Sequence, residues 1–353
     1  MPELTKTRDH AAAPDAPRAE RPRRRISIAE GAVVLALVLL LILPLPADNL
    51  QMISQLNQVV TVLASALSVY VMMRLKLLHF GVPAFMAVGG YSAALTAVHV
   101  TDNVVALVGV SLVVPALAAV PFGLITMRLR GTYFALVTFL IGQVVYLAIV
   151  ASDGLGGTDG ITGIPAPTLG GTLLGDGVAT LRIGLAVSLL AVVLVVVFTM
   201  VNGRRLDALR SNEVLAGSLG LRSWPVRLAA FVLSGALAGM SGFLIVNTLT
   251  TAHPSSFSTL TGVNYVAYVV VGGAASVLGP FVGTVLLVFL VVQFASEGVY
   301  AGALLGGLLI FTSLFLQKGL TGTVHDLTAW VVRRATGRSG SARPRDDSRK
   351  DQT

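Results

Sequence analysis

Residues 264–294 read NYVAYVVVGGAASVLGPFVGTVLLVFLVVQF, an apolar run without one charged side chain. A transmembrane helix needs about 20 mostly apolar residues, so this run is too long for a single span. Gly272, Gly273, Gly279 and Pro280 interrupt the run and predict a break in the helix. The stretch therefore forms either two short spans, which we favour, or a re-entrant hairpin whose backbone is covered by protein.

The chain as a whole has the same apolar character. Of the 353 residues in the full sequence, 54% are hydrophobic and only 12% are charged, and the mean hydropathy is +0.82. A soluble domain carries about 25% charged residues, so lipid must solvate much of this surface. The apolar runs are continuous, unlike the alternating strands of an outer-membrane barrel. We therefore expect an all-α, polytopic membrane protein.

About ten transmembrane helices are expected, and eight helices plus a re-entrant hairpin is the alternative. The expected spans are 29–47, 50–73, 77–100, 104–127, 131–151, 179–201, 228–250, two within 261–296, and 302–317. A disordered basic tail at 1–28 precedes this transmembrane domain of residues 29–317, and a second basic tail at 318–353 follows it. Residues 323–334 in that second tail have the pattern of a short interfacial helix.

Lysine and arginine residues lie on alternate sides of these spans. They follow the second, fourth and sixth spans, at Arg74, Lys76, Arg128, Arg130, Arg204, Arg205, Arg210, Arg222 and Arg227. The intervening connections carry acidic residues instead, at Asp48, Asp102, Asp153, Asp159 and Asp176. Because basic residues gather in cytoplasmic connections, both termini are expected to be cytoplasmic. The same distribution accounts for the formal charge of +8 without a nucleic-acid partner.

Several classes of chemistry lack the residues that they require. No charged residue lies at mid-depth in the expected spans, which argues against proton coupling, whereas sodium coupling through carbonyl and hydroxyl oxygens stays open. The sequence contains no phosphate-binding Gly-x-x-x-x-Gly-Lys-Ser/Thr loop, His-Glu-x-x-His motif or Gly-x-Ser-x-Gly motif. There is no cysteine, which excludes disulfides, thiol catalysis and cysteine-bound metals. We expect a transport protein without catalytic residues, resident cofactor or metal.

Three spans carry faces of polar or small residues. The second span presents Ser54, Gln58, Thr61, Ser65 and Ser68 at steps of four and three residues, which places them on one helical face. That face either lines a translocation path or packs against another helix. The fifth span offers Thr138, Gly142 and Tyr146, for which both interpretations also stand. The stretch SGALAGMSG (234–242) favours close helix packing.

A polar segment, LDALRSNEVLAGSLGLRSWPVR (206–227), interrupts the apolar pattern within a connection expected at 202–227. Ser211 is suited to cap a short helix in which Glu213, Ala216 and Gly220 share a face with spacing i, i+3 and i+7. Pro225 is expected to help end that helix. Such a helix either seats in a groove of a cytosolic partner or rests on lipid headgroups.

These residues resemble a known family, the permease subunits of branched-chain amino-acid ABC importers. NEVLAGSLGLRSWPVRLAAFVLSGALAGMSGFL (212–244) is similar to the family's cytoplasmic loop and next span, whose Glu-x-x-Ala-x-x-x-Gly signature is matched by Glu213, Ala216 and Gly220. Four further stretches resemble family motifs in the same order: FGVPAFMAVGGYSAAL (80–95), RLRGTYFALVTFLIGQVV (128–145), GGTDGITGIP (156–165), and HPSSF (253–257) with VVVGGAASVLGPFVGTVLL (269–287). The resemblance covers residues 75–320. Val82 stands where the family often has histidine, and Gln317 departs from its usual Pro-x-Gly-Leu.

The resemblance implies a multi-pass protein of the bacterial cell membrane. Its implied partners are the lipid bilayer, a second permease subunit, two cytosolic ABC ATPases that use ATP and magnesium, and an extracytoplasmic solute-binding protein. It implies that the segment 202–227 couples to the ATPase, through Glu213, Ala216, Leu219 and Gly220. The candidate path residues are Ser54, Gln58, Thr61, Ser65, Tyr91, Thr138, Tyr146, Gly272 and Gly273. Expected substrates are branched-chain or related amino acids, with urea and small organic acids as alternatives. A sodium-coupled secondary transporter of a small polar solute is the rival function.

Overall fold

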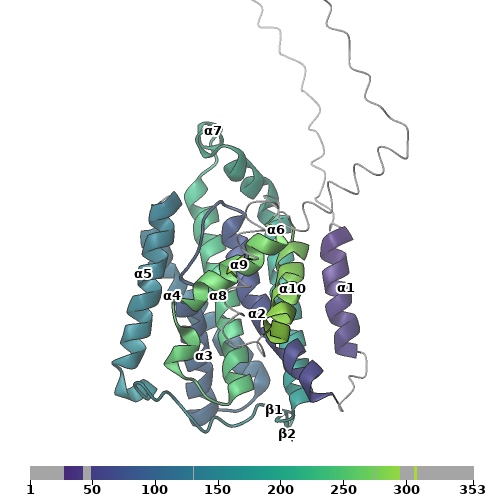
Figure 1. Ribbon diagram of the computed structural model, residues 1–353. Helices are drawn as coiled ribbons and strands as arrows, with labels where there is room; N and C mark the ends of the chain where they lie inside the picture. The colour runs from purple at the N-terminus through teal and green to yellow at the C-terminus, as the bar shows by residue number, and fades with distance from the viewer. Residues whose placement is uncertain (1–27, 43–48, 130, 275, 295–305, 308–353) are drawn as a thin grey trace, which may run out of the picture.

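The computed structural model describes residues 28–42, 49–129, 131–274, 276–294 and 306–307, which form a helical bundle with one short β-hairpin (Figure 1). In this described part, six helices are long and apolar enough to cross a bilayer. They are α2 (Leu50–Met73), α3 (Val82–His99), α4 (Val104–Thr126), α5 (Gly131–Val150), α6 (Gly177–Ser211) and α8 (Ser223–Leu249). The expected all-α class is confirmed.

The remaining helices are shorter. They are α1 (Ile28–Ile42), α7 (Glu213–Ser218), α9 (Thr261–Gly272), α10 (Leu278–Phe294), and the 3-10 turns η1 (Asp153–Leu155) and η2 (Pro254–Phe257). The expected span 302–317 and the basic tails, including the helix expected at 323–334, lie outside the described residues apart from Ile28 and the pair 306–307. A total of ten spans therefore stays a prediction.

The glycine-broken run that predicted a helix break does contain one. Helix α9 ends at Gly272 and α10 begins at Leu278, and the two helices pack against each other. A β carbon added at Gly272 would overlap the carbonyl oxygen of Gly279, so the glycines permit the close approach. With 12 residues, α9 rises only ~18 Å, less than the ~30 Å hydrocarbon core.

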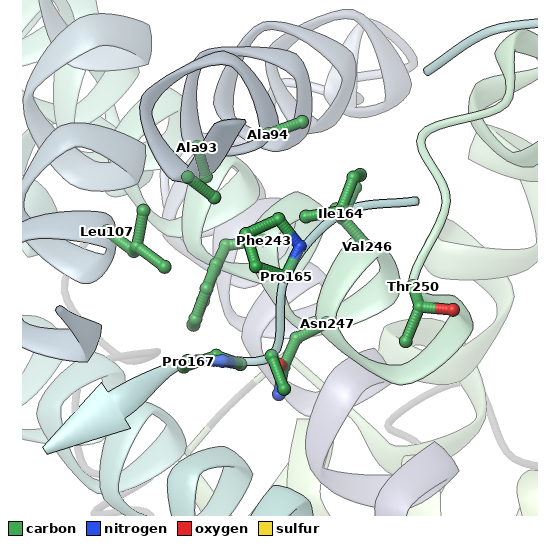
Figure 2. Close-up of a pocket in the computed structure, with 12 residues that line it drawn as sticks. Ala93, Ala94, Leu107, Ile164, Pro165, Pro167, Phe243, Val246, Asn247 and Thr250 are labelled. Carbon is green, nitrogen blue, oxygen red and sulfur yellow. The ribbon is translucent and has the colours of Figure 1, made fainter. Parts of the chain in front are cut away.

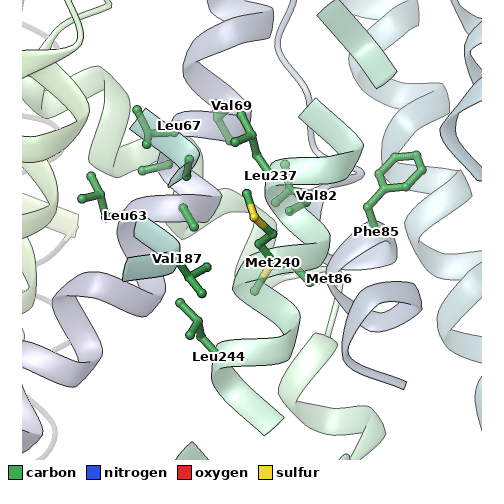
Figure 3. Close-up of a cluster of buried hydrophobic side chains, with 14 of the residues drawn as sticks. Leu63, Leu67, Val69, Val82, Phe85, Met86, Val187, Leu237, Met240 and Leu244 are labelled. Carbon is green, nitrogen blue, oxygen red and sulfur yellow. The ribbon is translucent and has the colours of Figure 1, made fainter. Parts of the chain in front are cut away.

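Helix α8 is the centre of the bundle, and α2, α3, α4 and α6 pack around it. A β carbon added at Gly239 would overlap Pro115 of α4, and one added at Gly89 of α3 would overlap the backbone of Gly239. Close packing by the small-residue face at 234–242 is therefore confirmed. Figure 3 shows the adjoining apolar core, in which Met240 and Leu237 of α8 lie among side chains of α2, α3 and α6.

Two helix boundaries differ from those expected. Helix α3 begins at Val82 rather than residue 77, because Pro83 in its first turn disfavours helix in the residues before it. Residues 77–81 are non-helical instead, and the Phe80 N–H donates to Thr138 Oγ1 across 3.3 Å. Helix α6 continues to Ser211, ten residues beyond the expected end of the span at 201.

The glycine-rich connection after α5 ties several elements together at one end of the bundle. Ile161 and Ala252 exchange two backbone hydrogen bonds of 3.0 and 2.9 Å. The Thr168 N–H donates to the carbonyl of Asp102 over 2.8 Å. Thr168 also begins the antiparallel hairpin of β1 (Thr168–Leu169) and β2 (Thr172–Leu173). In Figure 1 this hairpin and α7 lie at opposite ends of α6.

Candidate coupling surface and translocation face

Helix α6 carries the chain well past the other helices toward α7 (Figure 1). Its 35 residues rise ~52 Å, whereas a hydrocarbon core is ~30 Å thick. Its charged end, which holds Arg204, Arg205 and Arg210, therefore extends out of the bilayer. There the backbone of Asn212 becomes extended and a new short helix starts.

The cap of α7 is Asn212, not Ser211 as expected. The Asn212 side-chain oxygen accepts hydrogen bonds from the N–H groups of Val214 and Leu215, at 3.0 and 3.1 Å. Ser211 is still the last residue of α6, and its hydroxyl donates to the carbonyl of Asp207. Asparagine fits the cap because it accepts from the unpaired N–H groups of a helix start as well as serine does.

The other end of α7 closes through Gly220. The Leu221 N–H donates to the carbonyl of Ala216, and the Gly220 N–H donates to that of Gly217, both across 3.0 Å. This is the Schellman pattern, which needs a left-handed residue after the helix, and Gly220 has φ +83°. Gly220 therefore terminates the helix, and the expectation that it shares a helical face with Glu213 and Ala216 is wrong. Pro225 lies in the first turn of α8 instead of ending α7.

An ion pair fastens α7 to the start of α8. The Arg227 guanidinium donates to Glu213 Oε2 over 2.7 Å, and their side chains are only 9% and 20% exposed. Ala216 is buried as well. Two of the four expected coupling residues, Glu213 and Ala216, thus face the helical bundle itself and fix the orientation of α7.

The outer side of α7 is apolar. Val214 is 76% exposed, Leu215 58% and Leu219 76%, and Trp224 at the start of α8 is also exposed. We call these four residues the coupling surface. Exposed apolar clusters mark sites where another protein or a membrane surface makes contact. Leu219 was expected in this role; the other three were missed, although apolar residues within a charged connection were the available signal.

A second ion pair lies where α6 leaves the bundle. Arg74, which caps the end of α2, donates to Asp207 Oδ1 across 3.0 Å and lies 3.5 Å from the Tyr70 hydroxyl. The Arg74 side chain is 5% exposed and the Asp207 side chain 55%. This contact connects α2, which carries the polar stripe, to the helix that carries α7.

The polar stripe of α2 divides into two parts. Ser54 and Gln58 are exposed and Thr61 is half-buried. Ser65 is buried and donates to its own helix, at the carbonyl of Val62. Ser54, Gln58 and Thr61, which we call the outer stripe, are therefore the members of the stripe that are not buried, and Ser65 and Ser68 form its inner part.

Helix α8 accounts for the inner part of the stripe. Ser68 lies 2.8 Å from the Ser234 carbonyl and 2.9 Å from its hydroxyl. The Ser241 hydroxyl donates to the carbonyl of Thr61 over 2.7 Å. In this inner part the interpretation as helix packing holds. A further polar residue beside the stripe, Asn57, was missed; it is buried and donates to the carbonyl of Gly177 in α6.

Most other candidate path residues lie inside the fold. Tyr91 is buried against Phe257, with ring centroids 6.0 Å apart. Thr138 is fully buried and donates to the carbonyl of Ala135 in its own helix. Gly272 and Gly273 form the break between α9 and α10. Tyr146 is half-buried on α5, so it and the outer stripe stay the accessible candidates.

A small cavity lies beneath the glycine-rich connection, and Figure 2 shows it between Ala93 and Ala94 of α3, Pro165, and Asn247 of α8. Its volume of about 20 Å³ holds one water molecule but no amino acid. The Asn247 Nδ2 group is buried there without a hydrogen-bond partner among the described residues. This cavity is therefore not a solute site.

Comparison with known proteins places these features in a family. A family model described as branched-chain amino acid transport system / permease component matches residues 51–313. LivM of Escherichia coli K12, a high-affinity branched-chain amino acid transport system permease protein, is 30% identical over 293 residues, 76% of this chain and 69% of the relative. LivM of Salmonella typhimurium LT2 is 30% identical over 272 residues, 69% of this chain and 63% of the relative. The alignments thus span about two thirds of these relatives. No solved structure matches the chain.

Proposed function

The chain belongs to the family of branched-chain amino acid transport system permease components, and we propose that it translocates branched-chain or related amino acids as one half of an ATP-driven importer. Its relatives are named for branched-chain amino acid transport. The apolar helices support a multi-pass protein of the bacterial inner membrane. The partner subunits would be a second permease, two cytosolic ABC ATPases and an extracytoplasmic solute-binding protein.

The observation that carries this proposal is the coupling surface. Leu215 and Leu219 are exposed on α7 and at its end, beyond the charged end of α6, whereas Glu213 and Ala216 turn inward and hold α7 in place. In our proposal the ATPase contacts Val214, Leu215, Leu219 and Trp224. Glu213, Ala216 and Gly220 shape the helix that presents them.

The proposed orientation has α7 and both termini in the cytoplasm. Arg74, Arg128 and Arg204 lie at the ends of α2, α4 and α6 that point toward α7, and Asp102 and Asp176 lie at the opposite end of the bundle. This distribution follows the enrichment of basic residues in cytoplasmic connections.

The conformational change of the ATPases would be transmitted to the translocation path through α6 and α8. Closure of the ATPases would press on α7, and the Glu213–Arg227 and Arg74–Asp207 pairs would pass the displacement to α8 and α2. The solute would move along the outer stripe of Ser54, Gln58 and Thr61, where α2 is accessible. ATP and magnesium would act in the ATPase, not in this chain.

The test replaces an apolar residue of the coupling surface with a charged one. Leu219→Asp is expected to lower both co-purification of the co-expressed ATPase and ATP-dependent uptake of leucine into vesicles by about tenfold or more, since burying one leucine contributes roughly 1.5–3 kcal/mol. Leu173→Asp changes a similarly exposed leucine on β2; it is the matched control and is expected to leave ATPase co-purification unchanged.

Two results would overturn the proposal. Normal ATPase association of Leu219→Asp would show that the ATPase does not bind at the coupling surface. Leucine uptake driven by a sodium gradient, with no ATPase present, would instead establish the rival secondary transporter.

A further inference from the structure

A groove of about 530 Å³ lies on the outside of the bundle between α4 and α6, separate from the coupling surface and from the α2 stripe. The short β-hairpin closes one end of it. Its apolar lining consists of Val104, Val105 and Val108 of α4, Leu169 and Leu174 at the hairpin, and Ala179, Ile183, Ala186, Val187 and Leu190 of α6. The acyl tail of a membrane lipid is the kind of group that such a lining accepts.

Among the described residues that line the groove, Arg182 is the only charged one. It is exposed, and it is the one ionised side chain of α6 between Gly177 and Asn202. It lies five residues into the helix, ~8 Å from its start, which places the guanidinium near the headgroup level of a bilayer. No carboxylate in the described part of the chain forms an ion pair with it, whereas Arg74 pairs with Asp207 and Arg227 pairs with Glu213.

The apolar groove lies relative to Arg182 as the tail of a lipid lies relative to its headgroup. From Arg182 to Leu190 the groove follows α6 for ~12 Å toward the centre of the membrane. The face around it is open to lipid, since Val105, Leu190 and Val193 are all exposed there. The planar guanidinium donates in pairs to phosphate oxygens and stays charged at any physiological pH.

We propose that this groove binds one phospholipid with an anionic headgroup, its phosphate on Arg182 and one acyl chain between α4 and α6. The lipid fills the space that the two helices leave open and joins them near the hairpin. An anionic headgroup is favoured over a zwitterionic one because no carboxylate among the described residues forms an ion pair with Arg182.

The experiment uses the full-length chain in phosphatidylcholine nanodiscs that contain a small fraction of phosphatidylglycerol. Native mass spectrometry after release from the disc counts the phosphatidylglycerol that stays bound. Arg182→Gln is expected to reduce the retained lipid about tenfold, the effect of losing one charge-assisted contact. Arg182→Lys should retain most of it. Ala186→Trp should displace it by filling the groove, because Ala186 is exposed within the lining.

Two matched controls separate this site from general attraction to the membrane. Arg128→Gln removes another exposed arginine, and Ala148→Trp adds the same bulk on the lipid-facing side of α5; both should retain the lipid. Equal retention by wild type and Arg182→Gln, or equal loss with Arg128→Gln, would overturn the proposal. So would retention by the isolated chain but not by the chain in complex with a second permease, because the groove would then be a subunit interface.

Discussion

Removing the Glu213 carboxylate should free α7 from α8 without unfolding the bundle. The Arg227 side chain is only 9% exposed, so Glu213→Ala leaves a nearly buried guanidinium without this carboxylate. Breaking a fully buried pair costs about 3–5 kcal/mol, and a single hydrogen bond to a charged group contributes about 1.5–3 kcal/mol. Because Glu213 itself is one-fifth exposed, we expect about 2 kcal/mol, which raises the undocked population of α7 roughly 30-fold.

Spin labels can measure this population directly, since the chain has no native cysteine. One label is placed at Gly217, which is exposed on α7 with open space around it, and the other at Arg128, the exposed residue after α4. Electron paramagnetic resonance should give one narrow distance distribution for wild type and a broad one for Glu213→Ala. The charge-swapped pair Glu213→Arg with Arg227→Glu should narrow the distribution again. An unchanged distribution in Glu213→Ala would refute the assignment of this ion pair as the fastening of α7.

Three further substitutions test other parts of the structure. Gly220→Val should destabilise the end of α7 by about 1–2 kcal/mol, because φ is +83° there, whereas Gly217→Ala should not; the same spin-label distances, with the α7 label moved to Ser218, check this. Gly239→Leu should abolish a monodisperse peak in fluorescence-detected size-exclusion chromatography, since the added side chain overlaps Pro115, whereas Gly109→Leu meets no neighbour and should behave like wild type. His79→Phe should match or exceed the thermal stability of wild type, because both imidazole nitrogens are buried without a partner among the described residues; a clear loss would reveal a hidden hydrogen bond.

The long spans were predictable because their limits are set by local chemistry. Helix α2 runs from Leu50 to Met73, as expected, since a capping asparagine precedes it and Arg74 follows it. Helix α4 ends one residue before the expected limit. In both cases the length of the apolar run between these local signals matches the length of the helix.

The face of α7 was not predictable from spacing. The i, i+3, i+7 pattern of Glu213, Ala216 and Gly220 assumed one continuous helix, whereas the left-handed Gly220 ends that helix first. The partner of Glu213 lies fourteen residues further along the chain, across a turn whose geometry the sequence does not show. The α2 stripe has the same difficulty, because period alone cannot say whether a serine such as Ser68 meets another helix or a solute path.

The unbroken course of α6 has a mechanical consequence. The hairpin lies at one end of this helix and α7 follows the other end, past the break at Asn212, and no proline interrupts the helix between Gly177 and Ser211. A force applied at either end of α6 therefore tilts or shifts the whole helix instead of bending it at a kink. In the proposed importer, a displacement at the cytoplasmic end of α6 would thus reach the hairpin end through the helix itself, in addition to the ion pairs that connect this region to α2 and α8.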